Sequence, residues 1–298
     1  MTTSATALPR HLVVATDFGP SADNALARAL ALAQGLGARL SLLHVVEPLP
    51  IVSAWGDAGS AAWLGVEALV QAGEEALARQ IARVPGASAA GVATACRVGM
   101  PRRDLGRIAR ELGGELLVLG ARNERRLGDR LIGNTAQAAV HHACLPLLVC
   151  RRPAAAPWRE VLAATDFGEA AVRAVALAEA LSPGARRRLL HVHASLPEAT
   201  LALVQPDPGQ LERYAAAAEA EASQRFDALC AGLPGWTGHF RRGHAGELLM
   251  ETIATHQPDL VALGSRGHGP WIGGLLGSLG QRVLAQGEAD VLLALAAT

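Results

Sequence analysis

The segment of this chain best suited to binding a ligand is a glycine-rich run from Gly264 to Ser278. It reads Gly-Ser-Arg-Gly-His-Gly-Pro-Trp-Ile-Gly-Gly-Leu-Leu-Gly-Ser, and it lies between a predicted buried strand and a predicted helix. Glycines let the backbone take positive φ values and approach a ligand closely. Free N–H groups and the dipole at a helix N-terminus favour a phosphate, and Ser278 could cap that helix or donate its hydroxyl to a phosphate oxygen. The run is neither a Walker A loop nor the closely spaced dinucleotide fingerprint.

The chain carries this pattern and its surroundings twice. Leu-Val-Val-Ala-Thr-Asp-Phe-Gly at 12–19 returns as Val-Leu-Ala-Ala-Thr-Asp-Phe-Gly at 161–168, and Leu-Leu-His-Val at 42–45 returns at 189–192. A second glycine-containing run lies at 120–134. The offset between the copies drifts only from 149 to 144 positions. A repeat of this length has the size of a domain and is too long for a solenoid unit.

Length and composition agree with two domains. At 298 residues, half of them apolar, the chain can build two substantial cores. We predict domains at 1–152 and 158–298, joined by a linker at 151–157 in which two prolines interrupt the periodicity. Short apolar runs alternate with longer amphipathic runs in both halves, which favours doubly wound α/β domains of flavodoxin-like or Rossmann-like type with parallel sheets.

The predicted elements have the same order in both halves. The strands are expected near 11–16, 39–46, 92–98, 115–119 and 145–150, then near 160–165, 187–193, 237–242, 259–263 and 289–295. The helices are expected near 21–35, 64–83, 102–112 and 134–142, then near 169–181, 208–231, 245–256 and 278–286.

The expected strand order brings distant residues to one crevice. Five strands with a helical excursion after the second favour the order 3-2-1-4-5, in which the first and fourth strands are neighbours. Ligands of such sheets bind outside the carboxyl ends of the strands, where the order reverses. Thr165 and Asp166 end the first strand of the second half, and Gly264 ends its fourth strand. Asp166 could also simply cap the turn or the helix that follows it.

Both halves resemble the universal stress protein domain, and the resemblance covers essentially the whole chain. Nucleotide-binding members of that family carry Gly, two residues, Gly, nine residues, Gly and then Ser or Thr. Gly264, Gly267, Gly277 and Ser278 fit that spacing. The Ala-Thr-Asp-Phe and His-Val strand ends and the Asp-Leu-Val-Ala-Leu-Gly lead-in fit as well.

The resemblance implies binding of ATP, with or without Mg²⁺, or of another adenine nucleotide. Asp166 and Val192 would border the adenine, Gly264 and Gly267 the ribose and phosphates, and Gly277 with its successor the phosphates. The full set of predicted binding residues is Thr165, Asp166, Val192, Gly264, Arg266, Gly267, Gly277 and Ser278. The resemblance also implies that two domains form a dimer by pairing their terminal strands. In a tandem chain the two domains could pair with each other as an internal pseudo-dimer, or two chains could form a homodimer.

The first half departs from the family pattern. Asn123 replaces the second glycine of the run, and Asn134 replaces the serine. Asparagine tolerates positive φ, so the backbone path can survive, but the hydroxyl is lost. Glu124 and Asp129 would also repel phosphate, although neighbouring arginines could offset them. We therefore expect the nucleotide chiefly in the second domain.

Composition excludes several classes of function. A net charge of zero and a pI near 7.2 give no electrostatic footprint for nucleic acid. The absence of lysine removes the usual phosphate-binding, Schiff-base and general-base amine. We expect no signal peptide, no membrane span and a cytoplasmic location with four reduced cysteines. The histidines show no zinc spacing, and the arginines at 186–188 are expected to form a solvated edge.

Three functions stay open from the residues. The first is an ATP-binding signalling or regulatory module that responds to stress and acts on an unidentified protein partner. The second is a slow ATP hydrolase, for which no carboxylate is placed as a general base and no catalytic residue is assigned. The third is an interaction scaffold that binds no nucleotide.

Overall fold

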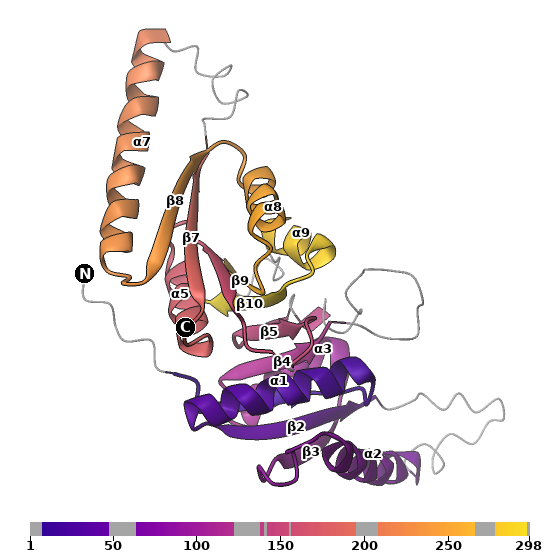
Figure 1. Ribbon diagram of the computed structural model, residues 1–298. Helices are drawn as coiled ribbons and strands as arrows, with labels where there is room; N and C mark the ends of the chain where they lie inside the picture. Colours follow the sequence, from indigo (N-terminus) through magenta and orange to yellow (C-terminus); the bar gives the residue numbers. More distant parts are fainter. Residues whose placement is uncertain are drawn as a thin grey trace, which may run out of the picture.

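A computed structural model of the chain describes residues 8–47, 64–121, 138–139, 142–154, 156–194, 208–265 and 278–296. Strands and helices alternate along most of the described chain, and the two halves lie one above the other in Figure 1. The elements of the first half are β1 (His11–Ala15), α1 (Pro20–Leu36), β2 (Arg39–Val46), α2 (Leu64–Arg83), β3 (Ala93–Val98), α3 (Pro101–Glu111), β4 (Leu116–Gly120) and β5 (Leu147–Cys150). The elements of the second half are β6 (Glu160–Ala164), α5 (Glu169–Leu181), β7 (Arg186–His193), α7 (Pro208–Ala231), β8 (Trp236–Arg242), α8 (Ala245–His256), β9 (Leu260–Ser265), α9 (Ser278–Gln286) and β10 (Asp290–Leu295).

The ten strands of the described residues form one sheet, in the order β3-β2-β1-β4-β5-β10-β9-β6-β7-β8. Counted within each half, this is the order 3-2-1-4-5, and the strands within a half pair in parallel. The α/β class and the doubly wound topology expected from the sequence are confirmed. The first and fourth strands of each half are neighbours, which places the ends of β6 and β9 side by side.

The two halves are joined through their last strands. β5 pairs with β10 in antiparallel fashion, with Val149 opposite Val291 and Leu147 opposite Leu293. Their apolar side chains are almost wholly buried. The tandem chain therefore forms an internal pseudo-dimer with one continuous sheet.

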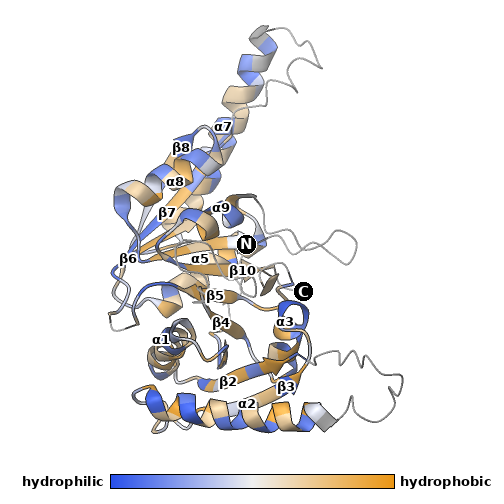
Figure 2. Cartoon of the chain, turned by 90° about the vertical axis from the view of Figure 1, so that its right-hand side faces the viewer, coloured by the Kyte–Doolittle hydropathy of each residue, from blue (hydrophilic) through white to orange (hydrophobic). Residues whose placement is uncertain are grey.

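Helices cover both faces of this sheet because the buried strands present apolar side chains to both sides. One face carries Leu12 and Val14 of β1 and is packed by α1, α2, α5 and α7. The other face carries Val13 and Ala15 and is packed by α3, α8 and α9. Figure 2 shows the central strands in hydrophobic colours, while α2 carries hydrophilic and hydrophobic residues along its length. Each hydrophobic cluster runs through both halves, so the domains share their core layers.

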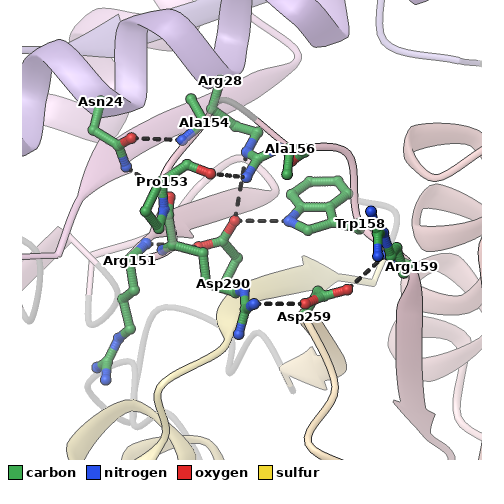
Figure 3. A network of polar contacts seen from close by, with 11 residues as sticks. Asn24, Arg28, Arg151, Pro153, Ala154, Ala156, Trp158, Arg159, Asp259 and Asp290 are labelled. Carbon is green, nitrogen blue, oxygen red and sulfur yellow. Dashed lines mark hydrogen bonds and ion pairs between the residues drawn. The ribbon is translucent and has the colours of Figure 1, made fainter.

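The segment predicted as a linker is held to both domains by hydrogen bonds (Figure 3). The Asp290 carboxylate is fully buried and accepts hydrogen bonds from the backbone N–H groups of Arg151 and Arg152 and from Trp158 Nε1. Its other neighbour is Arg28 of α1, whose Nε lies 3.6 Å away. We call these five residues the Asp290 clasp. It connects the first helix of one domain to the last strand of the other.

The four cysteines are free thiols in the structure, and Cys96 and Cys150 are buried. The arginines at 186–188 are not merely a solvated edge, because Arg186 and Arg188 both pair with Glu160, and Arg187 pairs with Glu179 at 3.7 Å. The partner carboxylates come from the neighbouring strand β6 and from α5, so sequence adjacency does not reveal these ion pairs.

Candidate functional site

The turn after β6 contributes polar side chains to the candidate site. Thr165 Oγ1 accepts a hydrogen bond from the Phe167 N–H at 3.0 Å, and Asp166 Oδ1 accepts one from the Gly168 N–H at 2.9 Å. These bonds support Phe167 at a φ of 63°, a left-handed conformation that a bulky residue rarely adopts. The structural role expected for Asp166 is therefore present.

The first half builds the same turn. Asp17 accepts a hydrogen bond from the Gly19 N–H at 3.1 Å, and Phe18 has a φ of 68°. Because the turn also occurs in the half whose glycine run departs from the family pattern, it does not by itself indicate a ligand. Evidence for a ligand site in the second half must therefore come from the residues that surround this turn.

A pocket of about 160 Å³ lies at the carboxyl ends of the second-half strands. Thr165, Asp166, Val192 and Gly264, four of the predicted binding residues, line it together. Most of the remaining wall is apolar, which is typical of small-molecule sites with a few placed polar groups. The other lining residues are Ala164, Ala171, Leu190, His191, Ala245, Leu249, Leu263, Leu279, Gly280 and Leu293.

The remaining predicted residues belong to the glycine-rich run. Arg266, Gly267 and Gly277 lie outside the described residues, as do Asn123 and Asn134 of the first half. Ser278 is the first residue of α9, as the sequence predicted. Leu279 and Gly280 of the same helix line the pocket, so the N-terminal turn of α9 borders the cavity.

Gly264 meets a structural requirement that is independent of any ligand. A Cβ atom at this position would lie 2.4 Å from the Ala171 backbone nitrogen at the start of α5. Gly120 is equally restricted, since its Cβ would lie 2.5 Å from the Ser21 carbonyl oxygen. Glycine at the end of the fourth strand is thus required by packing in both halves.

His191 forms the floor of the turn. Its Nδ1 lies 2.8 Å from the Thr165 carbonyl oxygen, which can only accept, so Nδ1 carries the proton of this hydrogen bond. The ring is buried and packs against Phe167 at 4.3 Å and Phe240 at 5.3 Å between centroids. Burial lowers the imidazole pKa, although the bond to Thr165 partly opposes that shift. The residue therefore serves as a packed, hydrogen-bonded support for the turn after β6.

Three histidines, of which His11 and His191 are buried and His239 is half-buried, predict a pH dependence of stability. Desolvation lowers the pKa of His11, His191 and His239, so the unfolded chain binds more protons than the folded chain near its ordinary pKa of about 6.5. Stability should therefore be lost as the pH falls from 7.5 to 5.5. Thermal unfolding at both values checks this, and His191→Gln, which keeps an N–H donor for Thr165, should reduce the difference. An unchanged melting temperature between the two pH values would contradict the prediction.

The sequence did not identify the wall that α8 contributes. Ala245 and Leu249 line the pocket, and α8 begins two residues after Gly243, whose φ is 136°. Gly99 and Gly243 are 144 positions apart in the repeat, and each follows the third strand of its half. This repeated glycine is the signal that could have placed the start of α8 at the same crevice.

The comparisons with known proteins identify the family. The model described as the universal stress protein family matches residues 9–151 and again 157–294. The chain belongs to the universal stress protein family. A universal stress protein from Archaeoglobus fulgidus DSM 4304 is similar in fold over 97% of this chain and 99% of its own length, with 16% identity and a TM-score of 0.69.

Other relatives match shorter stretches. Universal stress protein G of Shigella flexneri is 38% identical over 55 residues, which are 18% of this chain and 38% of that protein. The chain thus spans well under half the length of this curated relative. A universal stress protein solved in complex with cAMP is 24% identical over 48% of this chain and 98% of its own, with a TM-score of 0.33.

The described residues also limit other kinds of site. No group of three or more metal-ligating side chains occurs in that part of the chain. None of the helices described is long and apolar enough to cross a membrane.

Proposed function

We propose that this chain is a cytoplasmic tandem universal stress protein that binds ATP chiefly in its second domain and acts as a signalling or regulatory module in the stress response. The observation that carries the proposal is the pocket at the ends of β6, β7 and β9, with the start of α9 on its border. This is the position at which doubly wound sheets bind ligands.

The chemistry of the pocket suits an adenine nucleotide. Leu190, Leu249 and Leu263 give apolar surface for a flat base, and the Asp166 carboxylate can accept a hydrogen bond from the adenine amine. The N–H groups of the first turn of α9 and its dipole would favour the phosphates. Gly267, Gly277 and Ser278 would complete the phosphate side, and Arg266 would add positive charge. Any Mg²⁺ would arrive with the nucleotide and be held mainly by its phosphate oxygens.

The lining residues favour binding over hydrolysis. Among those described, Asp166 is the only carboxylate, and its Oδ1 already accepts the Gly168 N–H. A general base must reach the attacking water, and this carboxylate would instead face the base of the nucleotide. We therefore expect at most slow turnover, and a change of conformation or partner as the output.

Thermal unfolding with and without Mg-ATP tests the proposal. At ATP about 100 times its dissociation constant, stabilisation should be about 2.7 kcal/mol. For a domain of about 150 residues this is a shift of roughly 5–10 °C. Gly277→Val should remove the shift because a branched side chain obstructs the phosphate loop.

Gly133→Val is the matched control, since it places the same side chain at the equivalent position of the first domain. It should leave the shift in place. A shift that survives Gly277→Val and disappears in Gly133→Val would move the site to the first domain. No shift in the native chain would leave the interaction scaffold as the better account. Phosphate release followed over hours separates binding from slow hydrolysis, and parallel titrations with cAMP and ADP identify the preferred adenine nucleotide.

A further inference from the structure

The helix that borders the pocket is held at its other end by the first domain. Arg151 follows β5, and its guanidinium donates hydrogen bonds to the carbonyl oxygens of Leu284 and Gly287. Leu284 lies in the last turn of α9, and Gly287 directly follows that helix. The final carbonyls of a helix have no partner within it, and a cation there is favoured by the helix dipole.

The Asp290 clasp holds the backbone of Arg151 in place. The Arg151 N–H donates to Asp290 Oδ1 at 2.6 Å, and the Arg152 N–H donates to the same oxygen at 2.8 Å. Figure 3 shows the Arg151 side chain pointing away from the carboxylate that holds its backbone. The backbone of Arg151 is therefore bound to the domain connection through Asp290, while its side chain is bound to the C-terminal end of α9.

The sequence provides for this contact in the second half only. By the offset of 144 positions, the residue equivalent to Arg151 at the end of β10 is Leu295, which has no charge to offer. Asp290 is likewise equivalent to Pro146. The second domain alone thus combines the intact glycine run with an arginine from the other domain at the end of the following helix.

The short length of α9 links the contact at its C-terminal end to the pocket at its N-terminal end. The helix has nine residues, about 13 Å at 1.5 Å per residue, and behaves as a short rigid rod. Val283 and Leu284 anchor it in the core, while Leu279 and Gly280 line the pocket. A constraint on its last turn therefore also limits how its first turn can move.

We propose that Arg151 is a positioning residue for the phosphate-binding end of α9, and that it couples nucleotide binding in the second domain to the junction between the domains. The inference rests on the proposed function. Arg151 itself would make no contact with the nucleotide. It acts through the helix, so its loss should affect the phosphates of a nucleotide and spare the base.

The test compares Arg151→Met with Arg152→Met in the full chain. Both substitutions remove one arginine charge and keep the backbone N–H that Asp290 accepts, but the Arg152 side chain pairs with Asp259 at 2.9 Å instead of with α9. Calorimetric titration of Arg151→Met should show ATP affinity reduced about tenfold, as expected for loss of charge-assisted hydrogen bonds, with adenosine affinity unchanged. Arg152→Met should stay within about twofold of the native affinity for both ligands, because the side chain it removes pairs with Asp259 and not with α9.

Hydrogen exchange of the ligand-free proteins gives a second readout that requires no nucleotide. Amides of residues 282–286 should exchange about tenfold faster in Arg151→Met and at the native rate in Arg152→Met. Unchanged exchange in Arg151→Met would overturn the positioning role, whether or not ATP binds. Faster exchange with unchanged ATP affinity, or with equal losses for ATP and adenosine, would overturn the coupling to the phosphates. A native chain that binds no nucleotide would overturn the proposed function and the coupling, and the exchange result would still report on the helix.

Discussion

Replacing Asp290 with alanine will destabilise the folded chain by about 3–5 kcal/mol, the cost expected when one partner of a buried charge pair is removed. The carboxylate has no exposed surface, and Arg28 beside it is nearly as deeply buried. The substitution leaves the Arg28 guanidinium without its counter-charge. It also leaves the Trp158 Nε1–H without its acceptor at 2.7 Å.

Denaturant unfolding measures this effect, and Glu251→Ala is the control. Glu251 pairs with Arg241 at 3.2 Å on the surface, where both side chains are well exposed, so its loss should cost less than about 1 kcal/mol. Combining Asp290→Ala with Arg28→Met should recover part of the stability, because the second change removes the unpaired charge. Equal losses for Asp290→Ala and Glu251→Ala would show that the clasp contributes no more than a surface ion pair.

The fold was largely predictable because each prediction depended on local pattern or on the repeat. Apolar runs of strand length, separated by amphipathic runs, located the strands and helices, and α1, α5 and α8 begin within one residue of their expected positions. The duplicated halves then implied one topology twice. The helix expected at 134–142 lies mostly outside the described residues, and the predicted domain limits at 152 and 158 stay a prediction.

The Asp290 clasp was not predictable in the same way. Arg28, the segment 151–158 and Asp290 are separated from one another by more than 100 residues and occur in only one copy, so neither periodicity nor the repeat could connect them. The prolines at 153 and 157 correctly indicated a break in regular structure. A break does not reveal hydrogen bonding, however, and Arg28 donates to the carbonyls of Pro153 and Ala156 within that same segment.

The candidate site was predictable at its strand ends and not at its helical wall. Thr165, Asp166 and Gly264 could be brought together because strand order fixes which ends are adjacent. Ala245 and Leu249 carry no chemical signature, and only the packing of α8 against the sheet places them in the pocket. An apolar wall is thus visible only once the helices are docked.

Adding a methyl group at Gly264 will destabilise the second domain by about 3 kcal/mol, at the upper end of the cost of overpacking a core. The added Cβ would lie 2.4 Å from the Ala171 nitrogen and 2.7 Å from the Ala170 carbonyl carbon. Both are backbone atoms, so no side-chain rotation can relieve the contact, and α5 must move away from β9. Gly120→Ala should cost a similar amount, because its Cβ would meet the Ser21 carbonyl at 2.5 Å.

Gly35→Ala is the matched control for these two substitutions. Gly35 lies within α1, and a Cβ there would meet no atom within 4 Å, so alanine should stabilise the chain by roughly 0.5–1 kcal/mol. If Gly264→Ala lowered ATP affinity and left the unfolding free energy unchanged, the glycine would be retained for the ligand alone. Similar losses at Gly264 and Gly120 would instead assign the glycine to packing in both domains. The inference of a nucleotide in the second domain would then depend on Gly267, Gly277 and Ser278, which the first domain does not reproduce in full.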